Sequence, residues 1–360
     1  MTPYIVAIFN QKGGISKTTT STNLSVCLAA CGKSVVLIDL DSQGDSTKSL
    51  GIPSDTKRGI FDLFTGEARL DEVILETPFP GVRVIPSTYS LAGIEIKLAE
   101  SKDSQRTLSN IIRQAQFDCD YVVIDCPPAL GIMPVNALAS ANGVIIPVTA
   151  TPFANDGLIR TLPSIKYVQE GLNKSLLLQG VLFTIHDRNG PAKKISQMIR
   201  GRLGSTVYQT EIPRDTAVIE ASAARMPVCV YAPRSAAAAA HLDFTLEFLE
   251  RHQKIVAKQG GEMPPPPPRD EVMAVLNTWQ NEFEADRPSQ DTVRHQKNKL
   301  DRMLYGNRTT MERFHLGLVH FFIDHRMFLL IFLLIVAAIG GAILKFGFDG
   351  VSSLLDLIGL

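Results

Sequence analysis

Two lysines and a pair of threonines surround two glycines near the N-terminus, in the run Lys-Gly-Gly-Ile-Ser-Lys-Thr-Thr at residues 12–19. An apolar, β-branched stretch, residues 5–9, precedes this run and is typical of a buried strand. A helical pattern follows it. A strand, a glycine turn and Lys-Thr at a helix start form the context that a phosphate-binding loop requires. We therefore predict a nucleotide site in which Lys17 reaches the terminal phosphates and the Thr18 hydroxyl holds Mg²⁺.

Three aspartates stand at the ends of two further apolar runs. Asp39 closes residues 34–39 and is followed at alternate spacing by Asp41, while Asp125 closes residues 121–125. Carboxylates at the carboxyl ends of parallel strands lie over the crevice in which ligands bind. Asp125 is expected to hold Mg²⁺ through water, opposite Thr18. The alternative for Asp39 and Asp41 is that they are solvated strand-end carboxylates, and an apolar strand that ends in Asp, as at Asp125, also occurs by chance in many α/β proteins.

The order of three short motifs resembles the ParA/MinD group of ATPases over about 255 residues. These motifs are K-G-G-x-x-K-T at 12–18, D-x-D-x-Q-G at 39–44 and D-C-P-P-x-L-G at 125–131. The resemblance implies that Lys12 reaches the nucleotide of a partner subunit, so that MgATP joins two copies in a homodimer. It further implies that Asp41 positions and polarises the attacking water, that Asp39 supports Mg²⁺ and its loop, and that a partner protein stimulates hydrolysis.

The resemblance also supplies the residues that contact the nucleotide. Ser16 departs from it, because the family has glycine there; if the loop needs a positive φ, a Cβ costs about 1 kcal/mol. Adenine is implied to lie near the ends of the last two strands. The expected nucleotide contacts are Lys12, Gly13, Gly14, Ile15, Ser16, Lys17, Thr18, Thr19, Asn189, Pro213 and Arg214.

Strand and helix patterns alternate over residues 1–255, which predicts an α/β fold with a doubly wound, mainly parallel sheet. Residues 70–75 are expected to be helical. The further strands are expected at 82–87, 143–148, 176–185 and 207–214.

Five scattered cysteines favour reduced core thiols over a metal site or disulfides. No secretory signal precedes Tyr4, so we expect this domain in the cytoplasm.

Charge does not identify a partner for the whole chain, because 36 basic residues balance 36 acidic ones. Residues 181–260 are different: they carry eleven Lys and Arg against seven Asp and Glu, a net charge of +4. The resemblance implies non-specific DNA binding through this part, which would be directed at phosphates and salt-dependent. A solvated helix face explains the same charges. The candidate DNA contacts are Lys193, Lys194, Arg200, Arg202, Arg225 and Arg234.

The composition changes at residue 259. We expect an ATPase domain at 1–258, a proline-rich linker at 259–269 and a helical, polar region at 270–326. Residues 327–348 are almost uncharged and long enough to span a bilayer, with a short tail at 349–360. Arginines precede this stretch, which predicts a single-pass protein of the inner (cytoplasmic) membrane, held by lipid contacts of the C-terminal helix, with its ATPase domain in the cytoplasm.

Together these features predict a tethered ATPase that switches between nucleotide states to partition or position DNA or a large cargo. A nucleotide-switched regulator of a membrane assembly, such as a conjugation, secretion or envelope complex, is the alternative without DNA binding. A metabolic P-loop enzyme is a third hypothesis, which is disfavoured because the sequence shows no second substrate pocket.

Overall fold

The computed structural model describes residues 2–53, 55–98, 103–115, 117–151, 154–187 and 190–285. They belong to one compact unit that ends at Ala285. Its centre is a single sheet with the strand order β3-β4-β2-β5-β1-β6-β7-β8. Every neighbouring pair is parallel except β3 and β4. The strands are β1 (Tyr4–Ile8), β2 (Val35–Asp39), β3 (Leu75–Glu76), β4 (Val82–Ile85), β5 (Tyr121–Asp125), β6 (Gly143–Thr149), β7 (Leu177–His186) and β8 (Val207–Pro213).

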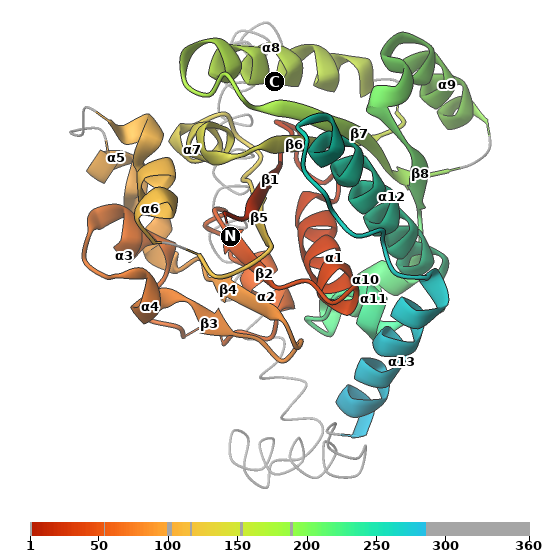
Figure 1. Ribbon diagram of the computed structural model, residues 1–360, viewed down its shortest axis with the longest axis horizontal. Helices are drawn as coiled ribbons and strands as arrows, with labels where there is room; N and C mark the ends of the chain where they lie inside the picture. The colour runs from red at the N-terminus through yellow and green to blue at the C-terminus, as the bar shows by residue number, and fades with distance from the viewer. Residues whose placement is uncertain are drawn as a thin grey trace, which may run out of the picture. The chain divides into compact units, whose positions relative to one another are not determined.

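The helices cover both faces of the sheet, as expected for a doubly wound fold (Figure 1). They are α1 (Lys17–Ala30), α2 (Asp45–Ser49), α3 (Ile60–Thr65), α4 (Leu70–Val73), α5 (Ile94–Leu98), α6 (Thr107–Ala115), α7 (Ile132–Ser140), α8 (Ala154–Gly171), α9 (Pro191–Leu203), α10 (Thr216–Ala223), α11 (Val228–Tyr231), α12 (Ala236–Lys258) and α13 (Arg269–Ala285). The predicted fold class and the predicted strands are therefore confirmed. The expected helix at 70–75 is shorter, because the chain turns after Val73 into the edge strand β3.

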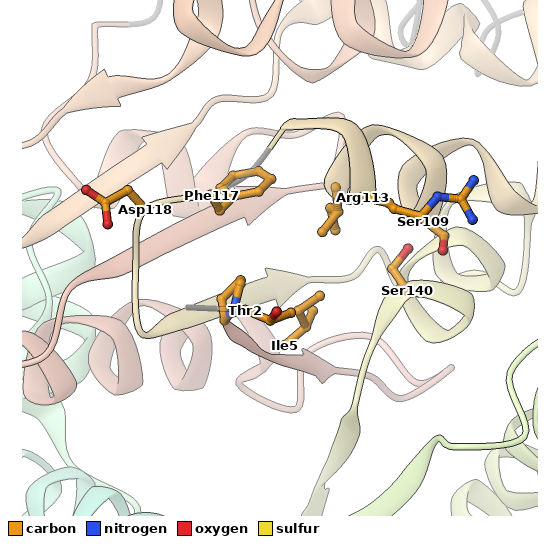
Figure 2. Close-up of a pocket in the computed structure, with 9 residues that line it drawn as sticks. Thr2, Ile5, Ser109, Arg113, Phe117, Asp118 and Ser140 are labelled. Atoms are coloured by element: carbon orange, nitrogen blue, oxygen red, sulfur yellow. The ribbon is translucent and has the colours of Figure 1, made fainter.

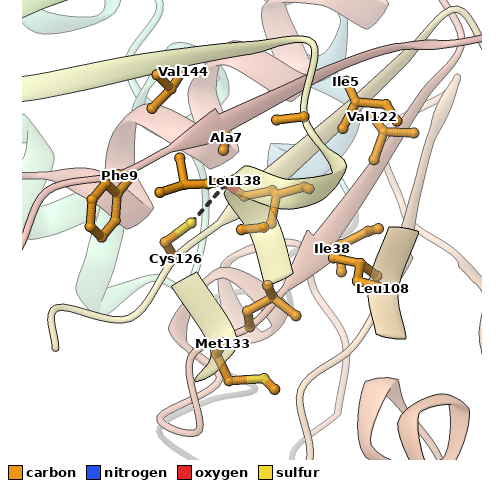
Figure 3. Close-up of a cluster of buried hydrophobic side chains, with 14 of the residues drawn as sticks. Ile5, Ala7, Phe9, Ile38, Leu108, Val122, Cys126, Met133, Leu138 and Val144 are labelled. Atoms are coloured by element: carbon orange, nitrogen blue, oxygen red, sulfur yellow. Dashed lines mark hydrogen bonds between the residues drawn. The ribbon is translucent and has the colours of Figure 1, made fainter. Parts of the chain in front are cut away.

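Strand β1 shows why the sequence makes two hydrophobic layers. Successive side chains of a strand point to opposite faces. Ile5 and Ala7 lie in the cluster that α6, α7 and α8 cover, whereas Val6 and Ile8 lie in the cluster that α1 and α12 cover. Figure 3 shows the first layer, in which Leu138 of α7 is drawn next to Ala7 of β1 and Leu108 of α6 next to Ile38 of β2. Because both faces of the strand are buried, its sequence is continuously apolar rather than alternating.

Helix α13 extends the compact unit beyond the expected boundary at residue 258. Its Val272, Leu276 and Trp279 are buried, and the helix packs against α1 and α11. At its far end the ring of Phe283 lies 5.1 Å from that of Phe79, just before β4 begins. The sequence predicts a helical, polar region from residue 270, apart from an ATPase domain that ends at residue 258. The structure makes the helix part of the domain.

The prediction of a single-pass location in the cytoplasmic membrane is contradicted. In the part of the chain that the structure describes, no helix combines the length and the hydrophobicity needed to cross a bilayer. The stretch 327–348, on which the predicted anchor and its lipid contacts depended, lies outside the described residues.

Candidate functional site: a phosphate loop above three strand ends

The loop between β1 and α1 rises from the carboxyl edge of the sheet. Gly14 and Ser16 have φ angles of 68° and 63°, both in the left-handed region. Such angles turn the backbone sharply, and only glycine adopts them without strain. The departure at Ser16 therefore coincides with the backbone conformation for which the family uses glycine.

We predict that Ser16→Gly stabilises the protein, because it removes a Cβ from a left-handed position. The expected gain in the free energy of unfolding is up to about 1 kcal/mol, measured by thermal and denaturant unfolding. Ser109→Gly is the matched control: Ser109 lies in the right-handed helix α6, where glycine should destabilise by a similar amount. A loss of stability in Ser16→Gly would contradict the prediction.

Two buried side chains hold the loop, Asn10 at its start and Thr184 on β7. Asn10 Nδ2 donates to Pro147 O at 2.8 Å, and Asn10 Oδ1 accepts from the backbone N–H of Lys12 at 3.1 Å. The buried hydroxyl of Thr184 on β7 donates to Ile15 O at 3.0 Å. A loop fixed at both ends in this way can present its N–H groups to phosphate without reorganising.

The two lysines of the loop occupy different environments. Lys17 is 8% exposed, and its Nζ donates to Lys12 O at 3.0 Å across the loop. Burial lowers the pKa of Lys17, although Asp125 acts in the opposite direction. Lys12, in contrast, is exposed. One ammonium group therefore lies inside the loop while the other extends from it into solvent.

Asp125 lies directly beneath α1, buried in register beside Asp39 of β2. Ser21 Oγ, on the first turns of α1, donates to its Oδ1 at 2.9 Å. Burial, and then the charge of Asp39, raises the pKa of Asp125 to about 7. Its Oδ2 is buried and makes no hydrogen bond of good geometry among the described residues, although the Thr18 hydroxyl lies close enough to lower the pKa of the carboxyl. An unpaired carboxylate oxygen below Thr18 fits the chemistry of a Mg²⁺ site, which takes oxygen ligands and usually keeps several waters.

Asp39 is fully buried, and both its carboxylate oxygens accept hydrogen bonds. Oδ1 accepts from the backbone N–H of Asp41 at 3.1 Å, and Oδ2 accepts from the hydroxyl of Thr47 at 2.6 Å and from its backbone N–H at 2.9 Å. Because these bonds occupy both oxygens, Asp39 is better suited to fixing residues 41–44 and the start of α2 than to coordinating a metal directly. Asp41 itself is half-buried, and its Oδ1 accepts from the N–H of Gln43 at 3.0 Å. Hydrogen bonds therefore fix the backbone at Asp41, and its carboxylate lies near the phosphate loop.

The expected adenine contacts lie at the same edge of the sheet. His186 at the end of β7 pairs with Pro213 at the end of β8. The next residue, Arg214, places its guanidinium 3.5 Å from Asp187 Oδ1, and both side chains are largely exposed. Asn189 lies outside the described residues. The fold therefore brings Pro213 and Arg214 to the edge that carries the phosphate loop.

The basic residues of α9 separate into two kinds. Lys193 and Lys194 are exposed near the start of the helix. Arg200 is instead engaged with β8: it donates to Tyr208 O at 2.8 Å and to Glu211 Oε1 at 2.9 Å. Charge counting along the sequence could not distinguish them. Arg200 is therefore a structural residue, and Lys193 and Lys194 are better candidates for contact with an external phosphate.

A cavity of about 560 Å³ lies far from these residues. Figure 2 shows Thr2 and Ile5, at the start of β1, facing Phe117 and Arg113 across it. The phosphate loop follows the other end of β1. This cavity is therefore separate from the candidate nucleotide site.

Comparison with known proteins agrees with the geometry. Residues 4–178 match the family model described as an AAA domain. The chain is 38% identical to the sporulation initiation inhibitor protein Soj of Bacillus subtilis over 245 residues, which make up 68% of this chain and 97% of Soj. It is 37% identical to the chromosome partitioning protein ParA of Caulobacter vibrioides over 258 residues, 71% of this chain and 97% of that protein.

A solved structure gives the cofactors. Cobyrinic acid a,c-diamide synthase from Mycobacterium smegmatis, with bound ADP and magnesium, is similar to this chain with a TM-score of 0.62 and 30% identity. The match covers 74% of this chain and 100% of that one. Together with the phosphate loop and the unpaired oxygen of Asp125, these likenesses make the protein an ATPase that uses ATP and Mg²⁺. The chain belongs to the ParA/Soj/MinD-type family of P-loop ATPases.

Proposed function

We propose that this ATPase is a nucleotide-controlled switch in the partitioning or positioning of DNA or a large cargo. Two copies join across MgATP, each reaching the other's triphosphate with Lys12, and slow hydrolysis separates them. The observation that carries this proposal is the contrast between the two lysines. Lys17 is buried within its own loop, whereas Lys12 extends from the loop into solvent, where a second copy can meet it.

Within each site the residues divide the work. Lys17 and the loop N–H groups bind the phosphates and offset the charge that develops on the transferring phosphoryl group. Thr18 and Asp125 would hold Mg²⁺, which would offset negative charge on the phosphates when bound. Asp39 fixes the loop that carries Asp41, and Asp41 orients the attacking water. Pro213 and Arg214 border the adenine, and a partner protein accelerates the otherwise slow hydrolysis.

The molecular mass of the full chain in solution tests the proposal. Light scattering with Mg²⁺ and a non-hydrolysable ATP analogue should give twice the mass of a single chain, whereas MgADP should give the single-chain value. A single chain in the presence of saturating MgATP analogue would refute the proposed switch.

The proposal favours DNA as the partner, because Lys193 and Lys194 form an exposed basic pair on α9. We predict salt-sensitive, MgATP-dependent binding to DNA of arbitrary sequence. The double variant Lys193→Glu/Lys194→Glu should bind at least about tenfold more weakly and should reduce the salt slope by about two. Fluorescence anisotropy at several salt concentrations measures both quantities.

The matched control is Lys254→Glu/Lys258→Glu, which changes the charge equally on exposed positions of α12. Equal losses in both double variants would indicate a general charge effect. No DNA binding in MgATP would instead favour a switch that acts on protein partners alone.

A further inference from the structure

Helix α1 carries the phosphate-binding residues on its first turn, and its second turn is bonded to a distant part of the chain. Asn23 is 1% exposed. Its Nδ2 donates to Thr19 O at 2.8 Å, and its Oδ1 accepts from the backbone N–H of Cys229 at 2.9 Å. The hydroxyl of Thr22 also donates to a first-turn carbonyl, Thr18 O. Of these two side chains, only Asn23 also bonds to α11.

The bond to Cys229 satisfies a backbone group that the short helix α11 cannot satisfy itself. Cys229 is the second residue of α11, so its N–H lies in the first turn, where helices leave N–H groups without an internal partner. Val228, Cys229 and Val230 are all buried. Loss of the Asn23 amide would therefore leave a buried donor unpaired, so α11 and α1 depend on each other at this point.

Packing and hydrogen bonding both act at this junction. Val228 and Cys229 lie in the same buried cluster as Leu24 and Cys27, so α11 contacts the later turns of α1 directly. A pocket of about 180 Å³, lined by residues of α1, α2 and α10, lies beside the first turn of α1. The two hydrogen bonds of Asn23 add a direct link from α11 to that first turn.

Helix α13 restrains α11 from the other side. Leu276 and Trp279 are buried where α13 packs against α11 and α1. Gln280 Nε2 also donates to Tyr231 O, the last residue of α11, at 3.4 Å. At the start of α13, Arg269 Nε lies 2.6 Å from Asp243 Oδ1 of α12. A continuous path of contacts therefore leads from α13 through α11 and Asn23 to Thr19.

We infer that Asn23 is a positioning residue for nucleotide binding, and that α13 braces the phosphate loop through it. With α13 docked, α11 holds Asn23, and Asn23 holds the turn that carries Lys17, Thr18 and Thr19. When α13 is displaced, that turn loosens and MgATP binds more weakly. The inference rests on the proposed nucleotide site but does not require dimerisation.

Trp279 is the single tryptophan of the chain, so its emission reports the docking of α13 in the unmodified protein. Because binding to the docked state stabilises it, a non-hydrolysable MgATP analogue should raise the denaturant concentration at which this emission changes in the full chain. Asn23→Ala should reduce that rise at the same analogue concentration. An equal rise in both proteins would overturn the inference.

A double-mutant cycle tests the coupling itself. Asn23→Ala and Leu276→Ala should each raise the Kd for the analogue by about threefold to tenfold, and the double variant should bind no more weakly than the weaker single variant. Asn23→Asp keeps the acceptor for Cys229 and should recover part of the affinity. Ser25→Ala, which removes a hydroxyl bond to Ser21 O on the same helix, is the control, because the bond that it removes lies within α1.

Calorimetry gives the Kd values, and thermal unfolding identifies variants that are not folded. If the fold-increase in Kd of the double variant equals the product of the increases in Asn23→Ala and Leu276→Ala, then α13 and Asn23 act independently. A chain that binds no MgATP analogue at all would contradict the nucleotide site, whereas binding without coupling would contradict only the brace.

Discussion

Asp41→Ala is expected to slow ATP hydrolysis by about 100-fold to 10,000-fold, the usual contribution of a positioned acid–base group, while the MgATP-bound dimer persists. The backbone of Asp41 is held by Asp39, and its carboxylate stands half-buried near the phosphate loop. Removing the side chain takes away the group that orients water but none of the groups that bind phosphate. Phosphate release under single-turnover conditions measures the rate, and light scattering measures the dimer.

Asp45→Ala is the control for this variant. Asp45 lies four residues further along the chain, at the start of α2, and its carboxylate pairs with Lys48 Nζ at 3.0 Å on the surface. This variant loses the same charge but should hydrolyse ATP at nearly the normal rate, because exposed ion pairs contribute little. An Asp41→Ala protein with normal turnover, or one that no longer binds MgATP, would remove Asp41 from its assigned role.

Lys12→Ala should abolish the MgATP-dependent dimer and reduce hydrolysis by about 100-fold or more, a loss comparable to removing one preorganised donor. Because Lys12 extends away from its own loop, each separate chain should still bind MgATP with nearly unchanged affinity. Lys17→Ala provides the contrast, since this variant should lose nucleotide binding within its own loop. Light scattering and calorimetry distinguish the two losses.

Mixing these two variants gives a test that neither gives alone. A Lys12→Ala chain keeps Lys17 in its own loop, and a Lys17→Ala partner still supplies Lys12 from outside. One complete site can therefore form between them, and hydrolysis should reappear on mixing. Absence of any recovery, together with a normal dimer in Lys12→Ala alone, would show that Lys12 acts within its own chain.

Sequence reasoning succeeded where the chemistry is local. The phosphate loop, its strand and the aspartates at 39 and 125 are close to one another because parallel strands end at the same edge, and that follows from the alternation of strands and helices. The positive φ of Ser16 could be anticipated in the same way, since a tight loop of this kind needs left-handed turns.

Contacts between residues far apart in the chain could not be read in advance. The stripe Val272, Leu276 and Trp279 predicts an amphipathic helix, but periodicity does not identify the surface that covers it. Asn23 reads as one more residue of α1, and only its bond to Cys229, 206 positions later, shows its importance. From the sequence alone, Arg200 is likewise expected to be a solvent-exposed charge, and only its bond to Tyr208 O of β8 shows its structural role.

The end of α13 and the nucleotide loop lie at opposite edges of the sheet. The last turn of α13 lies beside Phe79, at the edge where the strands begin, whereas the nucleotide loop occupies the edge where they end. If two copies meet at their nucleotide loops, as proposed, the contact between Phe79 and Phe283 would stay outside the interface. Substitutions at Phe283 should therefore leave the meeting of the two copies unobstructed.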